Sequence, residues 1–180
     1  MGTATSCGGD AMMRAAAFVE VGGFDSCIIA GEEPDLCVRL RARGWKVARI
    51  DAEMTQHDAG MTCFGQWWRR SVRAGHAYAE GAARHGRPPE RHCTREVRSI
   101  VAWAGAMPAL AVLLAWPTMG LSVAGVLILF LVQAMRITLG QRRRGREWRS
   151  AWVYAAFTML GKFAQLQGAA RSWLNRLSGR

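Results

Sequence analysis

The feature that most constrains this chain is a run of 37 residues without a charged side chain, from Ser99 to Met135. A helix needs about 20 apolar residues to cross the ~30 Å hydrocarbon core of a bilayer, so the run is nearly twice that length. Residues 116–120 (Trp-Pro-Thr-Met-Gly) interrupt it with a turn signal, and tryptophan favours the membrane interface. The sequence therefore predicts two membrane helices, at about 99–116 and 119–135, with a kink possible at Pro108.

The alternative for this run is a buried hairpin of a soluble protein, which 180 residues are too few to enclose. Charge surrounds the run unevenly. Residues 1–98 carry 14 basic and 12 acidic side chains, whereas residues 136–180 carry 10 basic and one acidic. Because arginines flank the run on both sides and the turn has no charge, the positive-inside rule places both flanks in the cytoplasm. We expect a multi-pass protein of a bacterial-type plasma membrane, with its N-terminal part cytoplasmic.

The basic tail, residues 138–180, contains an apolar stretch at 151–167 that is interrupted by Gly161 and Lys162. Its apolar residues recur at helical spacing, which favours an amphipathic helix at the membrane interface, with a third, short span as the alternative. Arginines that directly follow a span meet anionic lipid before any other polyanion. We therefore expect membrane lipids, and no nucleic acid, as partners of the tail.

The five cysteines are odd in number and form no Cys-x-x-Cys pair. This pattern indicates neither a zinc site nor a disulfide framework. Free thiols are typical of a reducing compartment, which agrees with a cytoplasmic N-terminal part.

The N-terminal part alternates helix and strand signals. Helix formers at 11–21 end at two glycines, and acids with Pro34 open a second helix near residue 32. Partial alternation predicts a short strand at 45–50, with a second candidate at 54–57. An amphipathic helix is expected at about 64–84, before a linker at 87–98 that leads to the membrane segment at 99–137.

The order of several motifs resembles family 2 glycosyltransferases. The match covers about residues 8–80, and the ordered combination is specific although each piece alone is weak. Its pieces are Gly-Gly-Phe-Asp at 22–25, Gly-Glu-Glu-Pro-Asp-Leu-Cys-Val-Arg-Leu-Arg at 31–41, Gly-Trp at 44–45, His57, and Gln-x-x-Arg at 66–69. The resemblance implies an α/β fold class, with residues 1–86 forming the C-terminal, acceptor-side half of a GT-A catalytic domain.

The resemblance also implies an activity. Members of this family are hexosyltransferase-like enzymes that transfer a sugar from a nucleotide-sugar donor to an acceptor hydroxyl, with inversion at the anomeric carbon. The expected partners are the nucleotide-sugar and a glycan or lipid-linked acceptor, and the expected cofactor is Mg²⁺ or Mn²⁺. The same family places membrane helices after the catalytic domain.

An inverting transfer needs a base that takes the proton of the attacking hydroxyl. By the resemblance this base is Glu33, which stands where the family usually has Asp, and Glu32 is the neighbouring candidate. Asp35 is assigned to the acceptor and diphosphate side, or to the start of the helix. The structural alternative is that all three acids only cap a helix.

Other site residues follow from the same resemblance. His57 is the candidate metal ligand, with a hydrogen-bonded surface histidine as the alternative. Gln66, Arg69 and Arg70 stand at the family's Gln-x-x-Arg-Trp motif, near the acceptor and the diphosphate, although Arg70 replaces the tryptophan. Guanidinium groups neutralise phosphates well, so Arg69 is the candidate diphosphate ligand. The alternative is a helix on the membrane surface whose arginines contact headgroups.

Two expected parts are missing from the sequence. It has no glycine-rich phosphate loop, and Asp51-Ala52-Glu53 is not an Asp-x-Asp motif. We therefore expect the nucleotide-binding half to precede Met1, and the chain alone to be inactive and to bind no nucleotide-sugar. The leading hypothesis is the C-terminal portion of a membrane-anchored inverting glycosyltransferase. The alternative is a non-enzymatic membrane-anchoring or docking module.

Overall fold

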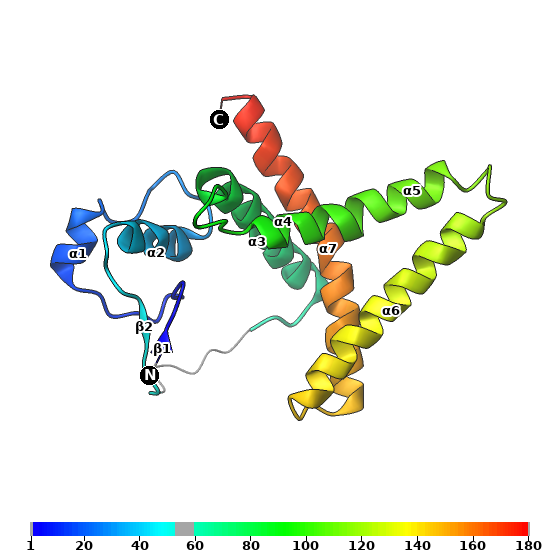
Figure 1. Ribbon diagram of the computed structural model, residues 1–180, viewed down its shortest axis with the longest axis horizontal. Helices are drawn as coiled ribbons and strands as arrows, with labels where there is room; N and C mark the ends of the chain where they lie inside the picture. The colour runs from blue at the N-terminus through cyan, green and yellow to red at the C-terminus, as the bar shows by residue number, and fades with distance from the viewer. Residues whose placement is uncertain (1, 53–59, 180) are drawn as a thin grey trace.

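The computed structural model describes residues 2–52 and 60–179. The helices are α1 Ala15–Glu20, α2 Glu32–Ala42, α3 Phe64–His85, α4 Thr94–Ile100, α5 Met107–Leu113, α6 Leu121–Arg143 and α7 Trp148–Leu177, with the π-helical segment η1 Val101–Ala106 between α4 and α5. Figure 1 shows three parts: α1 and α2 at one end, a central crossing of α3 with α7, and a protruding V made by α5 and α6. The fold is therefore mainly helix packed on helix.

The expected α/β fragment of a GT-A domain is wrong for the described residues. Their only sheet has two strands, β1 Gly2–Thr3 and β2 Ala48–Arg49, which pair antiparallel with Gly2 opposite Arg49. Each strand is two residues long and exposed, so the sheet has no face that a helix can cover. An α/β domain needs a broad sheet with helices packed on it. The second expected strand, at 54–57, lies outside the described residues.

The N-terminal helices share a small core of Ala17, Leu36 and Leu40. Met13, Phe18, Val21 and Trp45 cover this core from the side. Helix α2 begins after Gly31, whose φ of 93° favours glycine and whose added Cβ would lie 3.3 Å from the Cβ of Ala77. Gly31 therefore both turns the chain into α2 and lets that turn approach α3.

The crossing of α3 and α7 is the main packing contact of the molecule. Glycines allow the two backbones to touch: a Cβ on Gly168 would lie 1.9 Å from the carbonyl oxygen of Val72, and one on Gly75 would lie 2.0 Å from that of Gln165. The ring of Trp67 packs edge-on against Phe157, with centroids 5.0 Å apart. The buried residues of α7 are mostly small: Ala151, Ala155, Met159, Gly161, Ala164, Gly168, Ala169 and Ser172.

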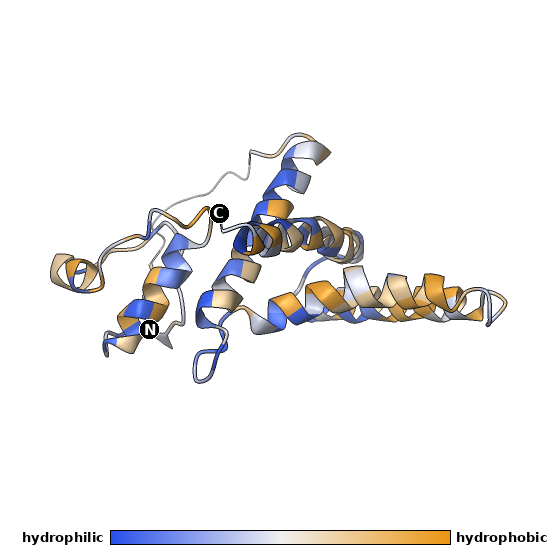
Figure 2. Cartoon of the chain, turned by 90° about the horizontal axis from the view of Figure 1, so that it is seen from above, coloured by the Kyte–Doolittle hydropathy of each residue, from blue (hydrophilic) through white to orange (hydrophobic). Residues whose placement is uncertain are grey.

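Two helical segments, Thr94–Leu113 and Leu121–Arg143, are long and apolar enough to cross a membrane. Figure 2 shows hydrophobic residues along both arms of the protruding hairpin. The first segment begins inside the expected linker at 87–98, and the second continues beyond the expected end at residue 137. Pro108 cannot donate a backbone hydrogen bond, and the turn before it widens into η1, where Met107 N–H bonds to the carbonyl of Ala102.

The expected tail helix at 151–167 lies within α7, which is longer in both directions. Among the described helices, α7 is not one of those apolar enough to span a membrane. Its packing against α3 gives the reason for its composition: one face consists of small residues that let another helix approach closely.

Candidate functional site

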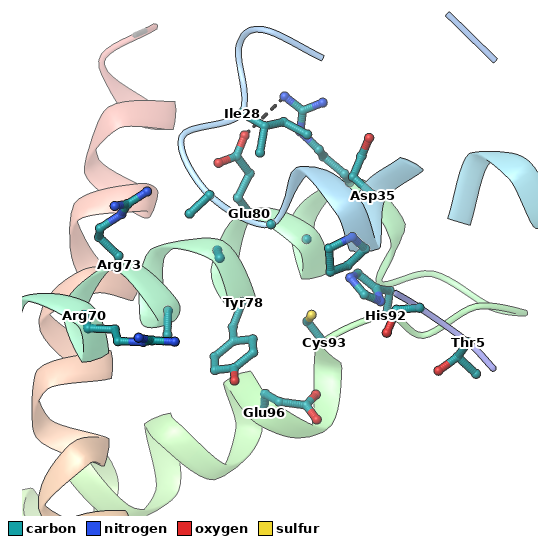
Figure 3. Close-up of a pocket in the computed structure, with 18 of the residues that line it drawn as sticks. Thr5, Ile28, Asp35, Arg70, Arg73, Tyr78, Glu80, His92, Cys93 and Glu96 are labelled. Carbon is teal, nitrogen blue, oxygen red and sulfur yellow. Dashed lines mark ion pairs between the residues drawn. The ribbon is translucent and has the colours of Figure 1, made fainter. Parts of the chain in front are cut away.

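A cavity of about 990 Å³ lies between the beginning of α2, one face of α3 and the beginning of α4. Figure 3 shows Arg70 and Arg73 on one side, His92 and Cys93 on the other, and Tyr78 between them. Four of the residues predicted from the sequence line this cavity together: Asp35, Gln66, Arg69 and Arg70.

Three arginines of α3 give the cavity its charge. Arg69, Arg70 and Arg73 are exposed and line the cavity, and Arg73 lies about one helical turn from each of the other two. Within the part of the chain that the structure describes, none of them forms an ion pair with an acidic side chain. Their guanidinium groups are therefore free to bind an anion such as a diphosphate.

Gln66 lies at the same end of α3 but is already hydrogen-bonded. Its Oε1 accepts hydrogen bonds from the backbone N–H groups of Thr62, at 2.8 Å, and Cys63, at 3.4 Å. These bonds belong to a capping box that begins α3. Gln66 lines the cavity, and its oxygen stabilises the helix that carries the arginines.

Asp35 is a structural residue rather than a free ligand. Its carboxylate is buried, with Oδ2 accepting from Arg39 Nε at 2.8 Å and Oδ1 lying 2.7 Å from His85 Nε2. Arg39 also donates to the carbonyl oxygen of Val21 at 2.5 Å. Since both carboxylate oxygens are engaged, Asp35 joins α2 to the end of α3. This geometry favours the helix-start assignment over the acceptor-side one.

Glu32 and Glu33 occupy the first turn of α2 and are half-buried. No hydrogen bond or ion pair engages either carboxylate within the described parts of the chain. Their neighbours Gly31, Pro34 and Asp35 line the cavity, whereas the two glutamates themselves do not. Both candidate bases are therefore next in sequence to residues that line the cavity, and neither carboxylate is held by another described residue.

The acidic residues near the arginine face are mostly neutralised. Arg84 bonds to Asp25 at 2.6 Å and to Glu80 at 3.2 Å. The hydrogen bond from Arg84 lowers the pKa of Asp25, and the same bond raises the pKa of Arg84. Among the described acidic residues that line the cavity, Glu80 and Asp35 are paired and Glu96 forms no ion pair, so three arginines face one unpaired carboxylate.

The end of the cavity next to α4 has a different character. Burial raises the pKa of Tyr78, and the nearby Cys93 and Glu96 raise it further. Burial and Glu96 raise the pKa of Cys93 to about 11. Burial also lowers the pKa of His92, with the charges of His85 and Arg41 acting in the same direction. At neutral pH, Tyr78, Cys93 and His92 are therefore uncharged, so this wall combines three uncharged polar groups with the acidic side chain of Glu96.

The implied divalent metal does not fit the described residues. They contain no group of three or more His, Cys, Asp or Glu side chains that could hold an ion. The candidate ligand His57 lies outside the described residues.

Several residues that line the cavity were not predicted from the sequence. Those on α3 follow a signal that was available: positions 66, 70, 73, 77, 80 and 84 recur every three or four residues and so share one helical face. No sequence pattern indicated the lining residues near the start of α4, because the contact between α4 and α3 depends on how the chain turns between the two helices. The unpredicted charged or polar residues are Thr5, Ser6, Arg73, Tyr78, Glu80, Arg84, His92, Cys93 and Glu96.

No protein-family model, curated protein or solved structure matches this chain.

Proposed function

We propose that the chain is the acceptor-side and membrane-anchoring portion of an inverting glycosyltransferase, in which the arginines of α3 hold a diphosphate at the membrane surface. One observation carries this proposal: Arg69, Arg70 and Arg73 line a single cavity and have no ion-pair partner among the described residues. The proposal concerns the chemistry of this cavity and needs no α/β sheet.

A diphosphate is the charged part of both a nucleotide-sugar and a diphosphate-linked lipid. It offers several oxygens, and each guanidinium group presents a planar fork of N–H donors to them. The uncharged side chains of Tyr78 and Cys93 then face the uncharged part of the substrate, and Glu96 beside them disfavours a second anionic group there. A cavity with a cationic wall at one end and no cluster of cations at the other suits a ligand with one charged and one uncharged end.

Glu33 is the proposed base that takes the proton of the acceptor hydroxyl, with Glu32 as the neighbouring alternative. The free carboxylates at the start of α2 support this assignment, because a base must not already be held by a cation. In a sugar-transfer assay of the complete enzyme, Glu33→Gln should lower turnover by ~10²–10⁴-fold, and Glu33→Asp should keep partial activity. Loss of activity only in Glu32→Gln would assign the base to Glu32 instead.

The membrane part of the proposal is a two-span hairpin in a bacterial-type plasma membrane, with both ends in the cytoplasm. Its support is the pair of long apolar helices and the arginines that flank them. Single-cysteine variants Thr118→Cys and Gly145→Cys test the orientation with a membrane-impermeant thiol reagent. The two positions should label from opposite sides, and labelling from the same side would contradict the hairpin.

Binding of inorganic diphosphate to the full chain in lipid nanodiscs, measured by calorimetry, tests the proposed site. Arg70→Gln combined with Arg73→Gln should weaken binding by about tenfold or more per arginine, since a hydrogen bond to a charged group contributes ~1.5–3 kcal/mol. Arg171→Gln, an exposed arginine of α7, is the matched control and should leave the affinity unchanged. Equal affinity in all three proteins would overturn the proposed site.

Nucleotide binding makes a second comparison in the same experiment. We expect UDP, with or without Mn²⁺, to bind no more tightly than inorganic diphosphate, because the proposed contacts of the arginines are with the diphosphate alone. Tighter binding of UDP by two orders of magnitude would show that this chain recognises the nucleotide itself.

A non-enzymatic membrane-docking module is the second candidate. The observation that favours it is that neither Glu32 nor Glu33 lines the cavity. Under this candidate the arginines still bind diphosphate, but neither glutamate affects transfer. Normal turnover of both Glu33→Gln and Glu32→Gln in the complete enzyme would therefore select it.

A further inference from the structure

The N-terminal segment and helix α2 are joined by two thiols in direct contact. The Sγ atoms of Cys7 and Cys37 lie 3.4 Å apart. Among the described residues this is the only pair of thiols within hydrogen-bonding distance, and both cysteines are free. Cys37 is buried in α2, whereas Cys7 is partly exposed. One sulfur is thus open to a reagent while the other lies directly behind it.

The surrounding contacts keep the two sulfurs together. The backbone N–H of Ala4 donates to the carbonyl oxygen of Val47 at 2.9 Å, and the guanidinium group of Arg41 donates to that of Thr5. A disulfide has an S–S length of ~2.05 Å, so the sulfurs need to approach by only about 1.4 Å. Cys7 lies outside any helix or strand, so this segment can supply the movement.

From this geometry we infer that Cys7 and Cys37 form a redox modification site, which a low-molecular-weight disulfide such as oxidised glutathione converts into an intramolecular disulfide. The Cys7 thiolate attacks one sulfur of the oxidant, breaks its S–S bond and releases the first glutathione. The Cys37 thiolate then attacks Cys7 and releases the second. Two protein thiols are oxidised, one glutathione disulfide is reduced, and the two thiol protons leave on the two glutathione molecules.

The environment of Cys7 also sets the conditions for the reaction. Burial and the neighbouring Cys37 thiol raise the pKa of Cys7, and the charge of Glu33 acts in the same direction. Since the thiolate is the reacting form, exchange should be slow at neutral pH and accelerate by about tenfold per pH unit up to pH 9.

The disulfide would fix one wall of the arginine-lined cavity. Thr5 and Ser6 line that cavity directly before Cys7, so the new bond would tie their segment covalently to α2. In the reduced chain, a two-residue strand and two hydrogen bonds hold the same segment. The inference concerns the thiols alone and does not depend on the proposed function.

The test uses the full chain in detergent with Cys27→Ser, Cys63→Ser and Cys93→Ser, which leaves only the pair. After incubation with oxidised glutathione at pH 8, tryptic cleavage at Arg14 and Arg39 separates the two cysteines. Mass spectrometry without reductant should show the two peptides cross-linked as the main product, and reductant should release them. Separate glutathione adducts, or two unmodified thiols, would overturn the inference.

Two further measurements separate proximity from general reactivity. A matched variant that keeps Cys7 and Cys27, with Cys37→Ser, should give glutathione adducts instead of an internal disulfide. The unsubstituted chain provides the check that does not depend on the variants folding. In it, cleavage by a glutamate-specific protease after Glu32 separates Cys27 from Cys37. Pairing of Cys7 with Cys27 there would contradict the inference.

Discussion

Helices α6 and α7 have 23 and 30 residues, and both are rich in apolar side chains, yet α7 buries many more of its residues against the rest of the chain. Leu127, Ile128 and Leu131 of α6 are 58–65% exposed. In α7, Ala155 and Ala164 are fully buried against the rest of the chain. One helix offers its large side chains to its surroundings, whereas the other buries small ones against protein.

The difference shows that apolar length alone does not decide what covers a helix. Glycine and alanine on one face of α7 let the backbone of α3 approach, and this close packing fixes the pair. The large aliphatic side chains around α6 support the proposed membrane span, in which lipid would cover them. The packed pair then presents the arginines of α3 on its other face.

The largest expected effect is at the crossing. Gly168→Val should destabilise the chain by about 3 kcal/mol or more, because the new side chain would collide with the backbone of α3. Gly125→Val in α6 is the matched control: nothing lies within 4 Å of its added Cβ, so the change should stay within ~0.5 kcal/mol. Unfolding in detergent, followed by tryptophan fluorescence, measures both. Equal losses of unfolding free energy in the two variants would contradict the difference in packing between α6 and α7.

Introducing a lysine into α6 or α7 tests which of the two helices lies in the bilayer. Ile128→Lys in α6 should make membrane insertion less favourable by about 3 kcal/mol, the cost of lysine near the centre of a span. Val153→Lys in α7, where the side chain is similarly exposed, should change insertion little because α7 does not cross the bilayer in this account. An in vitro insertion assay with glycosylation sites compares them. If Val153→Lys were as costly, α7 would be a third span.

A smaller effect concerns the polar contact at the crossing. Trp68 Nε1 donates to Gln167 Oε1 at 3.0 Å, which joins α3 to α7. Trp68→Phe should cost ~0.5–1.5 kcal/mol of unfolding free energy, the usual contribution of one hydrogen bond. Gln167→Ala should add little to Trp68→Phe in a double-mutant cycle. Fully additive losses would mean that the two side chains do not interact.

The smallest effect is a pH dependence at His92, where the end of α3 meets the start of the first apolar segment. Burial lowers the pKa of His92 below its ordinary value of about 6.5. Below that pH the unfolded chain binds a proton that the folded chain resists, so stability falls as pH falls. His92→Gln should flatten this fall between pH 6.5 and 5 in denaturant titrations. An unchanged slope would assign the dependence to other groups.

The long helices follow from the sequence because their signals are local. The uncharged run, its turn near Gly120 and the amphipathic pattern after Phe64 each depend on neighbouring residues. The sheet could not be predicted from the sequence, because its two strands are only two residues long. They also pair segments that are more than 40 residues apart in the chain. The expected GT-A α/β fragment came from a family resemblance, and local pattern could not test whether the strands would assemble.

In the candidate site, too, local sequence patterns predict some residues, whereas contacts between distant segments cannot be predicted from them. The sequence places Arg69 and Arg70 on one helix, and helical spacing extends that face to Arg73. It places three acids at the start of α2, and the family resemblance names Glu33 as the base and Asp35 as a helix-start or acceptor-side residue. Only the packing of His85 and Arg39 around Asp35 shows that Asp35 is engaged, while Glu32 and Glu33 stay free. Contacts between distant segments, such as that of Cys7 with Cys37, are beyond local pattern altogether.

In the proposed arrangement, α6 faces lipid while α7 packs on α3 and holds its arginine face in place. Photolabelling of the full chain in vesicles, with a lipid whose acyl chain carries a carbene precursor, tests this residue by residue. We predict labels around α6, at Leu127, Ile128 and Leu131, and none on Ala155 or Ala164 of α7. Labelling of those two alanines together with an unlabelled α6 would contradict the account.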